Sequence, residues 1–308
     1  MAVIVTGGAG IIGAETVRQL VARGETVVAA DLRPPKLPVD IAGKVRFARV
    51  DVSIFEEVLD LVMEVKPTRI YHFAAMLSQE AERRHALAFR VNVMGAHNIM
   101  EAARIGGVPR LLYVSSIGVY GRDLPDVIDD YSLQRPDIHY GCAKLFGENL
   151  GRWYFDKFKL DVRAIRYPMV AGVGDRALAH WSAPMIEDAI ARRHHTCVEA
   201  ARNSTSILIT EADSGRAAIE LLEAPVEKIK TRCYTVLGMK QSTVVEDLGR
   251  ELEKRYPGFK AEYTREQKPK LFRVIDDRYA REEWGWKPSH DTLDKLLAHF
   301  EARVKEAA

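Results

Sequence analysis

The sequence is short of cysteine, of long apolar runs and of net charge, and each shortage excludes a class of protein. Its 308 residues include three widely spaced cysteines (Cys142, Cys197 and Cys233), which form neither a disulfide framework nor a zinc knuckle. No apolar run reaches the length of a membrane span, and the first residues enter a strand at once without room for a signal peptide. The formal net charge is +2 without a long basic run. We therefore expect a cytoplasmic α/β protein with no membrane or nucleic-acid partner.

The N-terminus carries the pattern of a phosphate-binding glycine loop. Apolar residues 3–5 predict a short buried strand, and a helical segment runs to about residue 23. The glycines between them fit a dinucleotide fingerprint, which needs a tight turn, a close approach of backbone to pyrophosphate, and close packing of helix on strand. The phosphates would meet the N-terminus of the helix. The residues expected to bind the cofactor here are Gly7, Gly10, Ile11, Ile12 and Gly13.

Acidic residues at the ends of the next two strands predict how the adenosine half of the cofactor is held. The strand at 26–30 ends in Asp31, whose carboxylate can bind both ribose hydroxyls and repels a 2′-phosphate, so NAD is favoured over NADP. Arg33 could favour NADP, and we interpret it as a solvated loop residue. Asp51, followed by Val52, can meet the adenine amino group; a helix N-cap is the alternative.

The fourth strand opens into small residues that suit a backbone lying against the cofactor, namely Phe73, Ala74 and Ala75. Ser78 is a candidate substrate contact, with a plain loop serine as the alternative. A long helix is predicted from about 83 to 104, and Asn92 lies in its interior, where asparagine is mildly unfavourable. A core hydrogen bond near the site would explain Asn92, and a solvated helix face is the alternative.

A serine pair and a tyrosine–lysine pair predict the chemistry. The apolar run 110–114 predicts a buried strand that ends in Ser115 and Ser116, and ligands bind at this end of the strands in an open parallel sheet. Tyr140 and Lys144 are four residues apart on the next helix, so they share one face. A nearby ammonium favours the phenolate, and a serine hydroxyl can hold the substrate oxygen. The pattern predicts proton transfer coupled to the departure of a hydride.

The tyrosine–lysine spacing is weak evidence by itself. It recurs at Tyr256 and Lys260, where an intervening Pro-Gly pair prevents one helix face. For Tyr140 and Lys144 alone, a surface pair on an amphipathic helix is the alternative.

Strands and helices alternate as far as residue 167, which predicts a doubly wound parallel sheet of the Rossmann type. We expect the NAD-binding domain at 1–167 and about 204–240, and a smaller C-terminal α+β substrate lobe at about 168–203 and 241–308. A helix is expected at 176–193. His194 and His195 are adjacent, and neighbours on a helix point apart, so we expect no metal site.

Taken in order, these motifs resemble those of the extended short-chain dehydrogenase/reductase family, which includes NAD-dependent epimerases and dehydratases. The resemblance rests on residues 6–13, Asp31, Asp51, 72–75, Asn92, 115–121, Tyr140 with Lys144, and 166–168. It implies that Tyr140 is the acid/base, that Lys144 holds the nicotinamide ribose and lowers the tyrosine pKa, and that Ser116 is the catalytic hydroxyl. It extends the cofactor site to Asn92, Ser115, Tyr167 and Pro168. It also implies a homodimer through the helices near 83–104 and 138–158; packing of their apolar residues on the chain's own sheet is the alternative.

Within the family, the chain most resembles the short-chain type L-threonine 3-dehydrogenases. The stretches at 74–78, 162–168, 224–230 and 275–287 support this resemblance. Two segments that those enzymes share differ here, at 175–181 and 204–210, so we expect a different small polar or anionic substrate. The candidate substrate contacts are Ser78, Ser116, Arg176, His180 and Trp181.

We therefore expect an NAD-dependent dehydrogenase of a small hydroxy-acid, amino-acid or sugar-acid-like compound. The alternative is a nucleotide-sugar 4-epimerase or dehydratase that uses the same three residues, although such enzymes need a larger lobe for the nucleotide. A third interpretation is a nucleotide-sensing regulator without enzymatic activity. The intact set of Ser116, Tyr140 and Lys144 argues against it.

Overall fold

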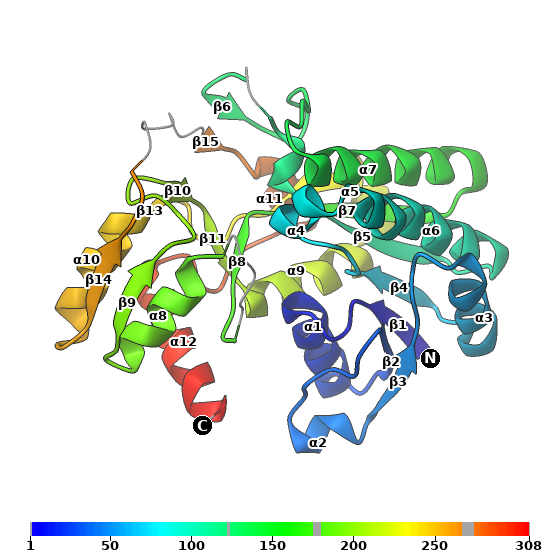
Figure 1. Ribbon diagram of the computed structural model, residues 1–308. Coiled ribbons are helices and arrows are strands. Elements are labelled where there is room, and N and C mark those ends of the chain that lie inside the picture. Colours follow the sequence, from blue (N-terminus) through cyan, green and yellow to red (C-terminus); the bar gives the residue numbers. More distant parts are fainter. Residues whose placement is uncertain (1, 122–123, 175–179, 267–273, 308) are drawn as a thin grey trace.

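A seven-stranded parallel sheet forms the centre of the molecule. The structure is a computed structural model that describes residues 2–121, 124–174, 180–266 and 274–307 (Figure 1). The strand order is β12-β7-β5-β4-β1-β2-β3, so the chain builds outward from β1 in one direction and then from β4 in the other. Ligands bind at such a switch point, beyond the carboxyl ends of the strands. The strands are β1 (Ala2–Thr6), β2 (Thr26–Asp31), β3 (Val45–Arg49), β4 (Arg69–His72), β5 (Arg110–Ser116), β7 (Asp161–Tyr167) and β12 (Cys233–Thr235).

Helices cover both faces of the sheet, as the doubly wound fold requires. Alternate residues of a strand point to opposite faces, so Val3 and Val5 of β1 lie in one apolar core and Ile4 lies in the other. The first core contains α1 (Ile11–Ala22) and α9 (Glu211–Glu223), and the second contains α3 (Phe55–Val65), α6 (Gly95–Ile105) and α7 (His139–Phe158). The predicted Rossmann sheet is confirmed.

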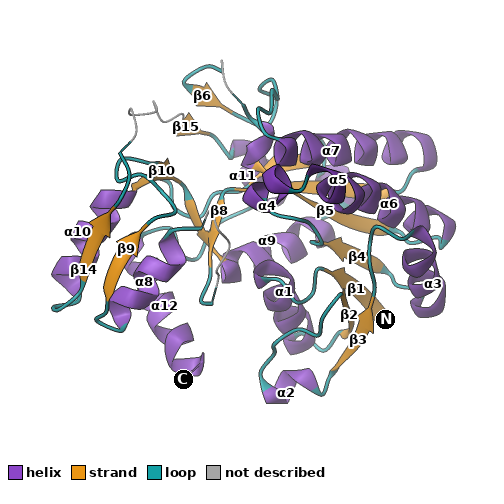
Figure 2. Ribbon diagram, viewed as in Figure 1, coloured by secondary structure: helices purple, strands orange, loops and turns teal. Residues whose placement is uncertain are grey.

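A smaller α+β lobe lies beside the sheet, on the left in Figure 2. Its own apolar core brings together Trp181, Cys197, Leu252 and Phe300 from segments far apart in the sequence. Its helices are α8 (Ser182–Ile190), α10 (Val245–Arg255) and α12 (Leu293–Ala307). Its strand pairs are β8 (Met169–Ala171) with β11 (Leu208–Thr210), β9 (His194–Cys197) with β14 (Lys260–Tyr263), and β10 (Thr205–Ser206) with β13 (Thr243–Val244). The residue boundaries proposed for the two domains stay a prediction.

The prediction of one long helix over 83–104 is wrong, because the segment is not a single regular α-helix. The segment consists of α4 (Ser78–Arg83), α5 (His85–Ala88), a π-helical stretch η1 (Phe89–Met94) and α6. Asn92 lies in the π-helical stretch and is buried there, so the solvated alternative for it is also wrong. A π-helical turn lets a side chain leave the regular ladder, and such turns are frequent at functional sites.

The helix predicted at 176–193 is shorter than expected, because α8 begins at Ser182 and residues 175–179 lie outside the described part of the chain. His194 and His195 are in strand β9 rather than on a helix. Their side chains still point to opposite faces, because successive residues of a strand alternate. Within the described ranges, none of the helices is long and apolar enough to cross a membrane.

Candidate active site

The glycine loop after β1 has the geometry that its sequence predicts. Gly7 adopts a left-handed φ of +69°, and a Cβ there would lie 2.6 Å from the Ala74 nitrogen on β4's exit loop. A Cβ on Gly13 would lie 2.1 Å from the Gly7 carbonyl oxygen, so only glycine lets α1 pack this closely. Gly10 is exposed and caps α1, with Ile11 and Ile12 as the first helical residues. The loop therefore leaves its outer side and the helix N-terminus open.

Asp31 lies directly beside this loop at the end of β2. Its carboxylate accepts hydrogen bonds from the backbone nitrogens of Ala9, at 3.0 Å, and Leu32, at 2.7 Å. The neighbouring Arg33 is exposed. Asp51 accepts a hydrogen bond from the Ser53 nitrogen at 2.9 Å in a local turn, but it is not the N-cap of α3, because Ile54 holds that position without a side-chain hydrogen bond, so the N-cap alternative is wrong.

Two further predicted cofactor segments follow strands of the central sheet, and Ala74 of one packs against the apolar cluster that contains Val52 of the other. Phe73, Ala74 and Ala75 follow β4 and are half-buried, and the buried Val52 follows β3. Asn92 holds the loop after β4: its amide accepts from the Met76 nitrogen at 2.7 Å and donates to the Met76 oxygen at 3.0 Å. Its role in the structure is therefore to shape this loop.

The predicted catalytic residues come together where β5 meets α7. Ser116 ends β5, and its Oγ accepts from the Gly118 nitrogen at 3.0 Å. Lys144 Nζ donates to the Val114 carbonyl oxygen at 2.7 Å and lies 5.5 Å from the centroid of the Tyr140 ring. A Cβ on Gly141 would lie 2.1 Å from the Gly118 oxygen, so the glycine permits this close approach of helix and strand end.

Burial dominates the protonation equilibria of this group. It raises the pKa of the Tyr140 phenol to about 12, and a hydrogen bond with the Ser116 side chain opposes the rise. It lowers the pKa of the Lys144 ammonium to about 7, and the Glu148 carboxylate opposes that change. In this structure burial outweighs any lowering of the Tyr140 pKa by Lys144, so the lowering that we expected from Lys144 stays a prediction. Ionising the phenol needs positive charge beyond what Lys144 supplies.

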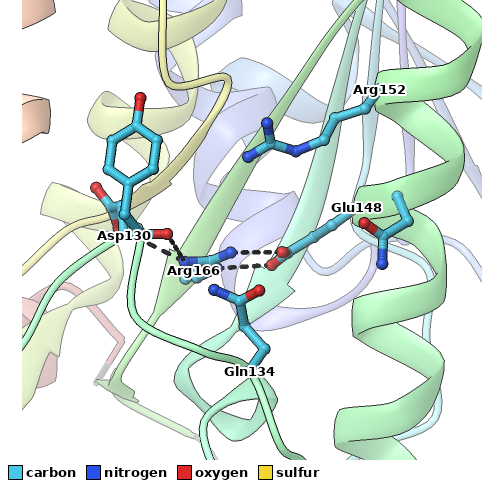
Figure 3. A pocket seen from close by; sticks show the side chains of 7 residues that line it. Asp130, Gln134, Glu148, Arg152 and Arg166 are labelled. Carbon is cyan, nitrogen blue, oxygen red and sulfur yellow. Dashed lines mark hydrogen bonds and ion pairs between the residues drawn. The ribbon is translucent and has the colours of Figure 1, made fainter.

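A buried ion-pair network next to Ser116 was not predicted from the sequence. The Arg166 guanidinium donates to both oxygens of Glu148, at 2.8 and 2.6 Å (Figure 3). It also donates to the Tyr120 hydroxyl at 2.7 Å. Ser115 Oγ donates to Glu148 at 2.6 Å. Arg166 and Glu148 line a polar pocket of about 280 Å³, together with Asp130. The available signal was the position of Glu148, four residues after Lys144.

This network joins α7 to β5, the two elements that carry the predicted catalytic residues. Lys144 and Glu148 are one helical turn apart on α7. The first bonds to Val114 and the second to Ser115, the two residues that precede Ser116. Ser115 was expected to bind the cofactor, and its hydroxyl is instead buried and committed to Glu148.

The remaining predicted contacts have different surroundings. Tyr167 is buried and its hydroxyl donates to the Ser214 oxygen at 2.5 Å, with the buried Pro168 next to it. Ser78 begins α4 and is half-buried, as is His180. Trp181 is 2% exposed in the core of the second lobe, so its ring is a packing residue there. The candidate contact Arg176 lies outside the described residues.

Comparison with known families identifies the chain. Residues 3–221 match the model of the NAD dependent epimerase/dehydratase family. The chain belongs to this family. The predictions of an NAD-dependent enzyme of the extended short-chain dehydrogenase/reductase type are confirmed.

Individual members of the family show how far the likeness extends. The chain is 29% identical to the mitochondrial L-threonine 3-dehydrogenase of Sus scrofa, over 94% of this chain and 79% of the pig protein. It is 30% identical to an uncharacterized epimerase/dehydratase of Staphylococcus haemolyticus, over 94% of this chain and 93% of the relative. The holo structure of a GalE-like L-threonine dehydrogenase from Cupriavidus necator has a TM-score of 0.88 at 26% identity, covering 98% of this chain and 99% of the other.

The residues present in this epimerase/dehydratase fit the dinucleotide. A Cβ on Gly10 would meet only the Gly7 oxygen, at 3.3 Å, so the space outside the loop is open to a ligand. The first turn of α1 has no acidic side chain to compete with phosphate for the helix N-terminus. The Asp31 carboxylate adjoins the same loop. NAD binding thus needs no rearrangement of these residues.

Proposed function

We propose that this protein oxidises the hydroxyl group of a small polar substrate and transfers the hydride to NAD. The observation that carries the proposal is the convergence of Ser116, Tyr140 and Lys144 at the carboxyl end of β5. Only β4 separates β5 from β1 and its glycine loop in the sheet. A bound dinucleotide can therefore reach from the loop to these side chains.

The three side chains have distinct tasks in this proposal. NAD, when bound, supplies the hydride acceptor. Tyr140, as the phenolate, takes the proton of the substrate hydroxyl, and the Ser116 hydroxyl donates a hydrogen bond to the same oxygen. The Lys144 ammonium stabilises the phenolate, and its bond to the Val114 oxygen keeps it in place.

The free energy needed to ionise Tyr140 predicts a pH dependence. Bringing its pKa from about 12 to near neutrality requires roughly 7 kcal/mol, since one pKa unit is about 1.36 kcal/mol. Two nearby positive charges, Lys144 and the oxidised nicotinamide, can supply energies of this order in a poorly hydrated cleft. The phenolate is the active form, so the oxidation rate should rise with pH.

The substrate class follows from the relatives and from the differing segments. The similar proteins include L-threonine dehydrogenases at 26–29% identity, which supports a small hydroxylated amino acid or hydroxy acid. We keep Ser78, Ser116, Arg176 and His180 as candidate contacts. Trp181 would act through the packing of the lobe rather than by contact.

The experiment measures the absorbance of reduced nicotinamide with purified protein, NAD and a panel of hydroxy acids, sugar acids and L-threonine. Tyr140→Phe should lower kcat by about 10²–10⁴, the usual contribution of a general base, and should leave the Kd for NAD within a few fold. Tyr256→Phe is the matched control, because Tyr256 shares the Tyr-x-x-x-Lys spacing but bonds to Glu301 in the second lobe. Retained turnover in Tyr140→Phe would contradict the mechanism.

An epimerase or dehydratase remains the alternative reaction. A UDP-glucose 4-epimerase from Thermotoga maritima shares the fold, with a TM-score of 0.86 at 20% identity and coverage of 100% of this chain and 99% of the other. If NAD stays bound through purification and the whole panel gives no absorbance change, nucleotide sugars become the substrates to test.

We also propose that the protein forms a homodimer through the outer faces of α6 and α7. Trp153, Phe146 and Phe158 of α7 are between 41% and 50% exposed, which is unusual for aromatic side chains on a surface without a partner. A groove of about 520 Å³ lies between the two helices and is lined partly by Trp153 and Phe158. A structural relative, 27% identical with a TM-score of 0.89 over 99% of both chains, is described as a monomeric L-threonine 3-dehydrogenase. Light scattering distinguishes the dimer from the monomer: we expect a dimer for the wild type and a monomer for Trp153→Glu.

We place the protein in the cytoplasm. All three cysteines are free, and Cys142 is exposed, which suits a reducing compartment.

A further inference from the structure

Three side chains that can bind a metal ion come together at the end of β9 in the second lobe. His195, Cys197 and Glu199 each offer one ligand atom, and these atoms lie within 4.8 Å of one another. His195 and Cys197 are two residues apart on a strand, so they share its inner face; His194 points outward. His195 can therefore share a metal ion with Cys197, two residues further along the strand, and not with its neighbour His194.

The imidazole of His195 is already oriented as a metal ligand. It is 6% exposed, and its Nδ1 lies 2.8 Å from Asp188 Oδ2. Metal-bound histidines almost always use their second nitrogen in this way, because a carboxylate fixes the tautomer and the ring orientation. The contact with Asp188 uses Nδ1, so Nε2 is the ring nitrogen left for a metal ion.

This second ring nitrogen makes no hydrogen bond within the described part of the chain. Among the described residues, His195 Nε2 is a buried atom without a hydrogen-bond partner. A buried polar atom left unpaired is destabilising. Coordination would satisfy Nε2, and it would do so beside the wholly buried sulfur of Cys197.

The ligand set and its spacing favour zinc. A thiolate, an imidazole and a carboxylate suit Zn²⁺ better than Mg²⁺ or Ca²⁺, which prefer oxygen alone. Tetrahedral Zn–S and Zn–N distances place sulfur and nitrogen about 3.6 Å apart, so atoms now within 4.8 Å must approach by at most about 1.2 Å. Glu199 is half-buried in the turn after β9, and one bond from the Val198 nitrogen holds its carboxylate. Its side chain can move the carboxylate toward the other two ligands, whereas the approach of sulfur and nitrogen requires movement of the Cys197 and His195 side chains.

Deprotonation of the thiol is the main cost of binding. Burial raises the pKa of Cys197, and its Sγ lies 3.7 Å from the Ala200 oxygen. A coordinated metal removes the thiol proton outright, because the ion is the largest local charge. Binding therefore releases a proton and strengthens as pH rises.

We propose that His195, Cys197 and Glu199 bind one Zn²⁺, with water as the fourth ligand, and that the ion ties β9 to the turn that follows it. In Figure 1, β9 lies in the lobe opposite α7, so the site is separate from Tyr140 and Lys144. Its role is structural, and it does not depend on the proposed oxidation reaction.

Cobalt is the probe, since Co²⁺ replaces Zn²⁺ and its bond to a thiolate gives a charge-transfer absorption band. Titration of the full-length protein with Co²⁺ should give this band at one ion per chain, and Zn²⁺ should abolish it. Cys197→Ser should remove the band. Asp188→Asn should weaken metal affinity by about 10- to 100-fold, which is the usual effect of losing the group that orients a ligand histidine.

Two matched controls test the assignment. His194→Gln alters the exposed neighbour of His195, and Cys142→Ser removes the exposed cysteine; both should bind Co²⁺ as the wild type does. Absence of the band at millimolar Co²⁺ would overturn the proposal, and so would a band that persists in Cys197→Ser or disappears in Cys142→Ser. Glu199→Gln changes a half-buried turn residue, so the variant should fold as the wild type does, with an unchanged circular dichroism spectrum. Weaker Co²⁺ binding in this variant would then support the site.

Discussion

Replacing Glu148 by glutamine tests whether the buried network holds the catalytic helix and strand together. Glu148 accepts two hydrogen bonds from Arg166 and one from Ser115. Glutamine keeps a single acceptor oxygen and carries no charge, so it can replace only part of this set. Arg166 would keep the Tyr120 hydroxyl and the Asp130 carboxylate, whose nearest oxygen is 3.7 Å away.

The expected loss of stability is large because the remaining charge stays buried. Arg166 is 1% exposed, and removing one partner of a buried pair typically costs about 3–5 kcal/mol. For a chain of 308 residues, with an unfolding entropy of about 2.1 cal/mol/K per residue, that loss corresponds to a fall in Tm of roughly 5–8 °C. The protein should still fold, since ordinary stabilities are about 5–15 kcal/mol.

Urea denaturation and thermal melting at pH 7 measure the change, with Glu64→Gln as the control. Glu64 makes a similar two-bond pair with Arg46, but on the surface, so its removal should leave the transition unchanged. A loss below about 1 kcal/mol for Glu148→Gln would refute the reasoning, because the pair would then behave as a solvated one. The pH profile gives a second readout. The Glu148 charge raises the Lys144 pKa, which is about 7 in the wild type, so in the variant Lys144 should lose its proton, and the activity that depends on the ammonium, at a lower pH than in the wild type.

Three further predictions concern the cofactor loop and the buried lysine. Gly13→Ala should destabilise the fold, because its Cβ would lie 2.1 Å from the Gly7 oxygen, whereas Gly10→Ala should fold normally and lose NAD affinity; thermal melting and NAD titration separate the two. The Lys144 pKa is about 7 in the folded chain and about 10.4 unfolded, so the unfolded state binds more protons between these values. Stability should therefore rise with pH over that window in the wild type and not in Lys144→Met, as measured by denaturation at several pH values. Asp31→Ser should raise the kcat/KM with NADP relative to NAD, because the carboxylate that repels a 2′-phosphate is gone; an unchanged ratio would remove Asp31 from the ribose site.

The geometry of the glycine loop in the candidate cofactor site could be predicted because its signals are local. The turn at Gly7 and the packing at Gly13 each depend on one residue type in a short strand–loop–helix segment. The alternation of apolar residues in β1 likewise decides which face each side chain meets. For the same reason, Tyr140 and Lys144 could be placed on one face of a helix from their spacing alone.

The errors arose where distant segments determine the environment. Trp181 looked like a substrate contact, but segments from β9, α10 and α12 close around it and make it a core residue. The helix around Asn92 is π-helical, and its amide bonds to Met76, sixteen residues away. Periodicity describes neither effect, because both depend on contacts between parts of the chain that are not adjacent.

The sequence by itself determined the family, the Rossmann sheet, the glycine loop and the choice of NAD, since short-range geometry and side-chain chemistry decide each of these. Only the tertiary structure decided that Glu148 joins Arg166 to Ser115, that burial raises the Tyr140 pKa, and that His195 faces Cys197. The physical reason is that burial and charge pairing depend on which groups exclude water from a site. In this protein those groups come from strands and helices that meet only when the chain is folded.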